Sequence, residues 1–266
     1  MNAQEAGGGE RAGAHPDRMT FLEHLDELRR RLVFSVICVL VAFVGAFYFN
    51  EPIFDFLMKP LRAAIEPLGG MMIATTLTEN FVLRLKMSLL VAVVGSTPLW
   101  LGQVWGFVAP GLYQNERRLA LPFVLVGSVF FVSGAVFCHY VLFPAAAQFL
   151  GGFGGGGEDF ELRYTISAAF SFYARLILGT AIVFQIPSLA LLLSRIGLIT
   201  PRFLVRYFKY ALLGIFVLAA LLTPPDPTTQ ILLAGPMIAL YALSIGIAWV
   251  GNLMRRRSRE REEPGD

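Results

Sequence analysis

The sequence predicts an all-α polytopic membrane protein with six transmembrane helices, on three observations. Hydrophobic residues make up 56% of the 266 positions, charged residues only 15%, and the mean hydropathy is +0.63. The charged residues gather in connectors between long apolar runs. Most of these runs approach the roughly 20 residues that a helix needs to cross a bilayer. This combination excludes an ordinary soluble domain.

We place the spans by their apolar runs, within a membrane domain of residues 19–251. The predicted spans are 33–49, 81–102, 119–142, 166–193, 210–222 and 231–250. As a helix, 210–222 covers only about 20 Å, and Pro236 interrupts the run after it, so the last two spans should be short. Short adjacent spans also suit docking of single-helix partners. Pro98 should kink the second span.

The segments outside the spans have their own signatures. Residues 1–18 predict a disordered tail, and 252–266 form a basic, charged C-terminal tail. The N-terminus lacks the apolar core of a cleavable signal, so the first span should remain as a signal-anchor. Residues 145–164, which contain GGFGGGG, predict a flexible linker beyond Pro144.

The segment before the first span has the pattern of an amphipathic helix lying in the membrane interface. Thr20 and Glu23 form a capping box, and leucines recur at helical spacing through FLEHLDELRRRL. Glu27 can pair with Arg31 one turn further on, which stabilises a helix by only about 0.2–0.5 kcal/mol. That pair is the structural alternative to a binding role for Glu27.

A second polar segment, QVWGFVAPGLYQNERR at 103–118, connects the second and third spans. Glu116 is the only carboxylate between residues 80 and 157, and it follows an aromatic stretch that includes Trp105 and Tyr113. A carboxylate beside aromatic rings suits a cationic partner. The alternative is an interfacial aromatic belt next to a solvated helix start.

The distribution of basic residues predicts the orientation. With six spans both tails share one side, and that side holds most of the 22 Lys and Arg residues. The positive-inside rule then makes both tails cytoplasmic and places Glu27 and Glu116 at the same cytoplasmic face. Two such carboxylates can hold two guanidinium groups by bidentate hydrogen bonds.

Several functions lack a signature in this sequence. Without a P-loop, GxSxG or HExxH motif we expect no enzyme, and the net charge of +3 reflects orientation rather than nucleic-acid binding. No cofactor or metal is expected, since Cys38 and Cys138 lie inside apolar runs and His24 has no second ligand at metal-binding spacing.

Two membrane alternatives stay open on the residues alone. A small-molecule secondary transporter would need polar groups converging at mid-membrane and usually two related halves, whereas Gln185 is nearly alone there and no repeat is visible. An intramembrane enzyme would need a catalytic pair at depth, and neither Ser nor His has a partner at a suitable spacing.

Three motifs together resemble the TatC family, the multispanning receptor subunit of the twin-arginine protein translocase. They are FLEHLDELRRRL, QVWGFVAPGLYQNERR and LLTPPDPTTQ, within a similarity that extends over about residues 20–250. The resemblance implies binding of twin-arginine signal peptides of folded precursors, and transport driven by the proton-motive force. It also implies single-span partners of the TatA and TatB type, self-association, contact with membrane lipid, and a bacterial or archaeal cytoplasmic (inner) membrane.

The resemblance also implies roles for particular residues. For signal-peptide binding these are Glu27, Arg29, Phe107, Pro110, Leu112, Tyr113 and Glu116. For transport they are Pro60, Gln185, Asp226 and Gln230. Many family members carry Glu at the position of Gln185; a Gln forms hydrogen bonds but carries neither charge nor proton, which puts a titrating role in question. The structural alternative for Asp226 is the organisation of a proline-rich turn.

Overall fold

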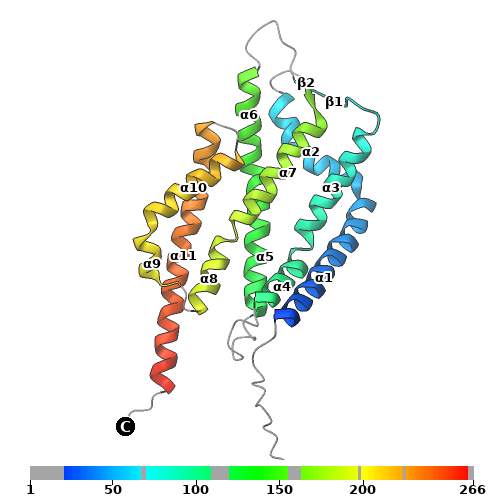
Figure 1. The fold of residues 1–266 in the computed structure, drawn as a ribbon. Coiled ribbons are helices and arrows are strands. Elements are labelled where there is room, and N and C mark those ends of the chain that lie inside the picture. The colour runs from blue at the N-terminus through cyan, green and yellow to red at the C-terminus, as the bar shows by residue number, and fades with distance from the viewer. Residues whose placement is uncertain are drawn as a thin grey trace, which may run out of the picture.

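The computed structural model describes residues 21–66, 70–108, 120–154, 163–196, 199–223 and 226–262, and it is a helical bundle (Figure 1). The helices are α1 Phe21–Tyr48, α2 Asn50–Ile65, α3 Glu79–Gly95, α4 Thr97–Val108, α5 Ala120–Phe137, η4 Cys138–Leu142, α6 Phe143–Gly154, α7 Ile166–Val183, α8 Ile186–Ile196, α9 Pro201–Arg206, α10 Phe208–Leu222 and α11 Pro227–Glu262. The strands are β1 Met71–Ile73 and β2 Arg163–Thr165.

Six helical paths account for the predicted spans. Within the described residues, four segments are long and apolar enough to cross a membrane: His24–Tyr48, Leu121–Gly152, Ile166–Ser194 and Pro227–Val250. A fifth path is the bent pair of α3 and α4, and α10 is a shorter apolar helix. The start of α1 and the end of α11 lie at the same end of the bundle, as an even number of crossings requires (Figure 1).

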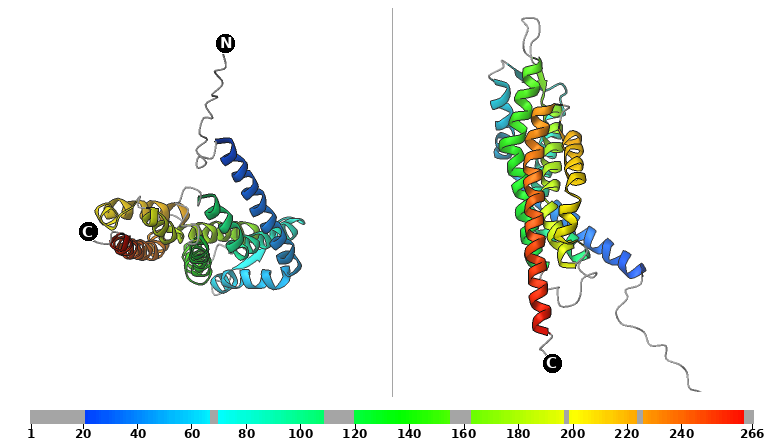
Figure 2. Two further views of the ribbon diagram at one scale, coloured as in Figure 1. Left: turned by 90° about the horizontal axis from the view of Figure 1, so that it is seen from below. Right: turned by 90° about the vertical axis from the view of Figure 1, so that its left-hand side faces the viewer.

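The interior of the bundle is built around α7. Seen along the axis, α10 and α11 lie at one edge, α1 and α2 at the other, and α7 between them (Figure 2). In the most apolar stretch of the α7–α8 span 56% of the residues are buried, against 0% in α1, so α1 presents its apolar surface outward. Buried Tyr173 and Leu176 of α7 meet Met87 and Phe131 in one core cluster.

α1 joins the predicted amphipathic segment and the first predicted span in one helix. It runs without a break from Phe21 to Tyr48, and its apolar candidate span already starts at His24. No proline or glycine separates the charged turns from the apolar ones, so nothing ends the helix at Leu32. Glu27 therefore lies on the same continuous helix as the first membrane span.

The predicted kink at Pro98 is confirmed. α3 ends at Gly95, α4 begins at Thr97, and the two axes differ by 58°. Pro98 has no N–H for the carbonyl of Val94, and the Thr97 hydroxyl donates to that oxygen at 2.7 Å instead. The bend directs α4 towards α1.

The prediction of a flexible linker after Pro144 was wrong for residues 145–154, which are helical in α6. The π-helical turn η4 ends at Leu142, two residues before Pro144. Such a turn carries an extra residue, which relieves the clash between a proline ring and the preceding turn, so the helix continues past it. Residues 155–162 lie outside the described part.

A buried carboxylate organises the opposite end of the bundle from the α1 start. β1 pairs with β2 in parallel, with Met71 opposite Arg163. Glu79, only 7% exposed, accepts hydrogen bonds from the Thr75 N–H at 2.5 Å and from the Ser167 N–H at 3.0 Å. It thus caps the start of α7 and fixes the loop that leads into α3. The sequence analysis missed this role, since Ser167 is 88 residues away.

The last span is longer than the sequence indicated. α11 starts at Pro227, and Pro236 does not interrupt it. Its candidate span, Pro227–Val250, has 24 residues, whereas α10 has 15. A capped N-terminus and packing against α8 and α10 hold the helix together where Pro236 removes one backbone bond.

Candidate functional site

Glu27 and Arg31 form an ion pair on one face of α1. The Arg31 side chain donates to Glu27 Oε1 from Nε at 2.9 Å and from Nη2 at 2.6 Å. The pair is only 14% and 23% exposed, respectively. The second carboxylate oxygen, Oε2, is buried and has no hydrogen-bond partner among the described residues. The pairing of Glu27 with Arg31, which was the alternative to a binding role, is therefore present. It occupies only one of the two carboxylate oxygens of Glu27.

α4 covers this pair through two consecutive residues. The Arg31 guanidinium lies against Gly106, where a Cβ atom would collide with it. Next to it, Phe107 stacks on His24 of α1, with ring centroids 4.4 Å apart and planes at 21°. Gly106 and His24 belong to this site, and the sequence analysis had assigned neither to it. The only sequence feature that pointed to this contact was the small residue between Trp105 and Phe107.

The remaining predicted signal-peptide residues divide between the exposed surface and undescribed positions. Arg29 is exposed on α1. Pro110, Leu112, Tyr113 and Glu116 lie outside the described residues. The end of α4 and the start of α5 both lie at the end of the bundle where α1 begins (Figure 1). The helix ends that flank the predicted loop thus lie at the same end of the bundle as the start of α1.

The free Oε2 atom determines what this end of the bundle can do chemically. A buried acceptor without a donor costs about 1–3 kcal/mol. A cationic N–H donor would remove that cost and add a charge-assisted bond. The adjacent stacked rings of Phe107 and His24 provide an aromatic surface for the same donor. The geometry suits a guanidinium or ammonium group.

Gln185 lies at the break between α7 and α8, in the interior of the bundle. Its Nε2 donates to the Gly127 carbonyl of α5 at 2.9 Å, while its Oε1 is buried without a partner. The buried Ser188 hydroxyl is also unpartnered in the described part. A Cβ at Gly127 would lie 3.2 Å from both oxygens, so the glycine leaves room for these polar groups.

Asp226 and Gln230 act on the hairpin of α10 and α11. Asp226, 3% exposed, accepts from the Thr229 N–H at 2.7 Å through Oδ1 and from the Thr229 hydroxyl through Oδ2. It is the N-cap of α11, with Pro227 as the first helical residue. Gln230 Nε2 donates to the Phe216 carbonyl of α10 at 3.1 Å. The start of α11 lies away from the end where α1 begins (Figure 1).

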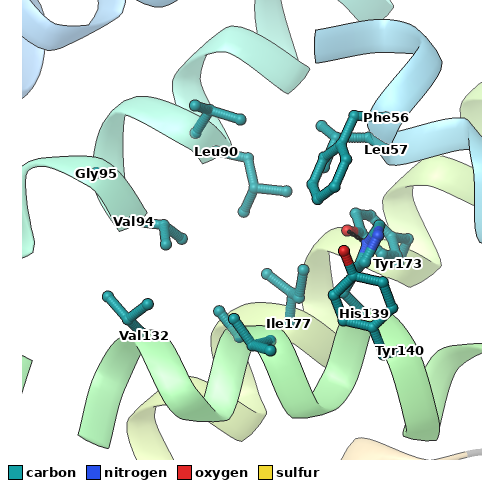
Figure 3. Close-up of a pocket in the computed structure, with 13 residues that line it drawn as sticks. Phe56, Leu57, Leu90, Val94, Gly95, Val132, His139, Tyr140, Tyr173 and Ile177 are labelled. Carbon is teal, nitrogen blue, oxygen red and sulfur yellow. Dashed lines mark hydrogen bonds between the residues drawn. The ribbon is translucent and has the colours of Figure 1, made fainter. Parts of the chain in front are cut away.

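Pro60 lies inside α2, half-buried, far from the α1 start (Figure 1). An apolar cavity of about 230 Å³ lies between α2, α3, α5, η4 and α7 (Figure 3). At its rim His139 Nδ1 is 2.7 Å from the Tyr173 hydroxyl, and Phe56 stacks on the His139 ring at 4.5 Å. Among the described residues no group of three His, Cys, Asp or Glu could hold a metal ion.

Comparison with known proteins places the chain among protein translocase components. A family model described as Sec-independent protein translocase protein (TatC) matches residues 23–236. The chain is 43% identical over 232 residues to the Sec-independent protein translocase protein TatC of Helicobacter pylori strain J99, covering 86% of this chain and 88% of that relative. It is 41% identical over 222 residues to the protein of the same description from Campylobacter jejuni, covering 84% and 90%.

A solved structure supports the same assignment. The crystal structure of the twin-arginine translocase receptor TatC in DDM matches with a TM-score of 0.74 and 34% identity, covering 85% of this chain and 99% of that one. Both the sequence and the arrangement of helices are therefore shared over most of the chain. The chain belongs to the TatC family and is a multi-pass membrane subunit of the Sec-independent protein translocase.

Proposed function

We propose that this chain binds the paired arginines of twin-arginine signal peptides at the end of the bundle where α1 begins. The observation that carries the proposal is the buried Oε2 of Glu27, which has no hydrogen-bond partner among the described residues. Glu116 supplies the second carboxylate, from the connector between α4 and α5. Two acceptors at one face match a partner with two adjacent guanidinium groups.

Arg31 acts as the positioning residue of this acceptor. By occupying Oε1 with two bonds, it fixes the carboxylate and leaves Oε2 for the incoming arginine. Gly106 allows the Arg31 guanidinium to lie between α1 and α4. The stacked pair of Phe107 and His24 offers a ring face beside the carboxylate, which favours a planar guanidinium over an ammonium.

The same proposal covers orientation, partners and energy. Both tails face the cytoplasm, since most basic residues lie on that side, and the membrane is a bacterial or archaeal inner membrane. The outer face of α10 receives single-span subunits of the TatA and TatB type: Leu213 is 64% exposed and Leu221 is 76% exposed. The chain is not an enzyme, and the proton-motive force drives transport.

Four residues support transport by holding the helices of the bundle in place: Pro60, Gln185, Asp226 and Gln230. Asp226 and Gln230 hold the α10–α11 hairpin on which partner helices would dock. Gln185 joins α8 to α5 without carrying a proton.

A peptide-binding measurement tests the receptor function. A signal peptide with Arg-Arg and the same peptide with Lys-Lys are titrated against purified protein in one detergent. We expect wild type to prefer Arg-Arg by roughly tenfold, in line with a bidentate charge-assisted pair. Glu27→Gln and Glu116→Gln should each reduce this preference. Asp26→Asn, which removes an exposed carboxylate on the same helix, is the matched control and should preserve it.

Equal affinity for both peptides in all four proteins would refute the assignment of the two carboxylates. The docking face is tested separately by a photo-crosslinking residue at Leu221. Crosslinks to a co-expressed single-span subunit support the proposal, and crosslinks to lipid alone contradict it.

A further inference from the structure

A groove between α3 and α7 combines two cations with an apolar wall. Its volume is about 410 Å³, and Lys86 of α3 and Arg175 of α7 both line it. The apolar part of the wall includes Leu89, Val93, Ala174 and Leu178. Among the described residues that line the groove there is no carboxylate. We call it the Lys86–Arg175 groove.

The two cations lie at similar depth in the bundle. α3 and α7 start at the same end, where the Glu79 carboxylate accepts from the Ser167 N–H. Lys86 follows the start of α3 by about 10 Å and Arg175 follows the start of α7 by about 13 Å, at 1.5 Å per residue. Both therefore lie about two helical turns in from that end of the bundle. Long basic side chains at such positions can extend towards the head groups while their stems pack on apolar surface.

Neither cation is neutralised within the described part of the chain. Both side chains are exposed, and neither forms a salt bridge there. Arg175 donates only a long bond, 3.4 Å, to the Ser171 carbonyl. Arg84, two residues before Lys86, is different: it donates to Asn50 Oδ1 and lies over the Phe54 ring.

The neighbouring apolar cavity shows what the cations add. The described residues of its lining include no Lys, Arg, Asp or Glu, and the cavity shares Leu90 of α3 with the groove (Figure 3). The groove thus has the same kind of wall but also two positive charges at one level. Helical spacing continues the wall from Lys86 to Leu89 and Val93, and from Arg175 to Leu178, towards the middle of the bundle.

We propose that the Lys86–Arg175 groove binds one anionic phospholipid. Lys86 and Arg175 together contact its phosphate, and an acyl chain lies along Leu89, Val93 and Leu178. Two basic side chains beside an apolar wall match a ligand that combines an anionic head group with an acyl chain. The lipid would join α3 to the central helix α7.

Native mass spectrometry of the full chain tests this site. Wild type is offered equal amounts of phosphatidylglycerol and phosphatidylcholine with the same acyl chains. We expect retained phosphatidylglycerol to exceed phosphatidylcholine by roughly tenfold. Lys86→Gln/Arg175→Gln should lower the ratio towards one, while Arg202→Gln/Lys209→Gln, which removes one Lys and one Arg elsewhere, should leave it unchanged. Lys86→Arg/Arg175→Lys keeps both charges and should retain the preference even if the neutral variant folds poorly.

A second measurement locates the lipid and identifies its source. Phosphatidylglycerol with a diazirine on its acyl chain should label peptides that contain Leu89, Val93 or Leu178, and millimolar inorganic phosphate should not displace it. Equal retention of both lipids by wild type overturns the proposal, as does full preference in the neutral variant. Labelling of an added single-span subunit from position 89 without any lipid preference would also overturn it, because the groove would then be a protein site.

Discussion

Two acidic residues of this chain, Glu27 and Asp226, resemble each other in the sequence and differ in the fold. Each stands near the start of a helix in a polar segment, and each is largely buried. Asp226 uses both oxygens on Thr229 and caps α11. Glu27 uses one oxygen on Arg31 and leaves the other buried without a donor.

The difference separates a structural carboxylate from one that can bind a ligand. A carboxylate whose acceptors are all occupied within its own helix turn stabilises that turn and offers nothing to a partner. A carboxylate that is held by one oxygen is positioned and still has an acceptor available. This criterion favours the α1–α4 end of the bundle as the recognition site that we propose, and it assigns Asp226 a structural role in the α10–α11 hairpin.

Removing Asp226 should have the largest effect on stability. Asp226→Ala leaves the buried Thr229 N–H and hydroxyl without their acceptor, which should lower the free energy of unfolding by about 2 kcal/mol. The midpoint of thermal unfolding in one detergent measures this, with Asp226→Asn as a control that retains a capping oxygen. Glu27→Ala should unfold at nearly the wild-type temperature. A larger loss for Glu27→Ala than for Asp226→Ala would reverse the comparison.

Gln185 is an intermediate case, because its amide Nε2 donates a hydrogen bond while its Oε1 accepts none among the described residues. Gln185→Glu replaces the Nε2 donor to Gly127 with an oxygen, so two acceptors would face each other in the interior. The unfolding free energy should fall by about 1–2 kcal/mol at neutral pH. Thermal unfolding measures the loss, and Gln185→Met, which fills similar space without a second acceptor, is the control. Wild-type stability in the Glu variant would contradict the assigned hydrogen bond.

Gly106→Ala tests whether Arg31 positions Glu27 for binding. The new Cβ collides with the end of the flexible Arg31 side chain, which can move, so stability should change by less than about 1 kcal/mol. Displacement of Arg31 frees Glu27 to rotate, and affinity for the Arg-Arg peptide should fall by roughly fivefold. Gly102→Ala on the same helix is the control, since a Cβ there meets Val124 at an ordinary 3.7 Å. Unchanged peptide affinity in Gly106→Ala would remove Arg31 as the positioning residue.

Phe107→Leu should have the smallest effect. The substitution keeps an apolar side chain on α4 but removes the aromatic ring that stacks on His24. A cation bound over that ring would gain about 0.5–1 kcal/mol from it. Affinity for Arg-Arg should fall roughly threefold, and affinity for Lys-Lys should fall less. Titration of both peptides measures the difference. An equal loss for both would show that the ring contributes area rather than guanidinium recognition.

The sequence by itself determined which parts of the chain enter the membrane. Apolar runs of near-spanning length have one stable outcome in a bilayer, because a helix satisfies its own backbone hydrogen bonds there. The sequence also determined the bend at Pro98, since a proline removes an N–H wherever it stands in a helix. Glu27 was identified by its motif, and its pairing with Arg31 follows from i,i+4 spacing alone.

Only the tertiary structure decided the outcomes that depend on distant neighbours. Pro98 and Pro144 look alike in the sequence, yet one bends its span and the other continues through a π-turn, because the preceding turn differs. The cap of α7 comes from Glu79, and the position of Arg31 depends on the absence of a side chain at Gly106. Free acceptors, such as Glu27 Oε2, can be recognised only when every nearby donor has been placed.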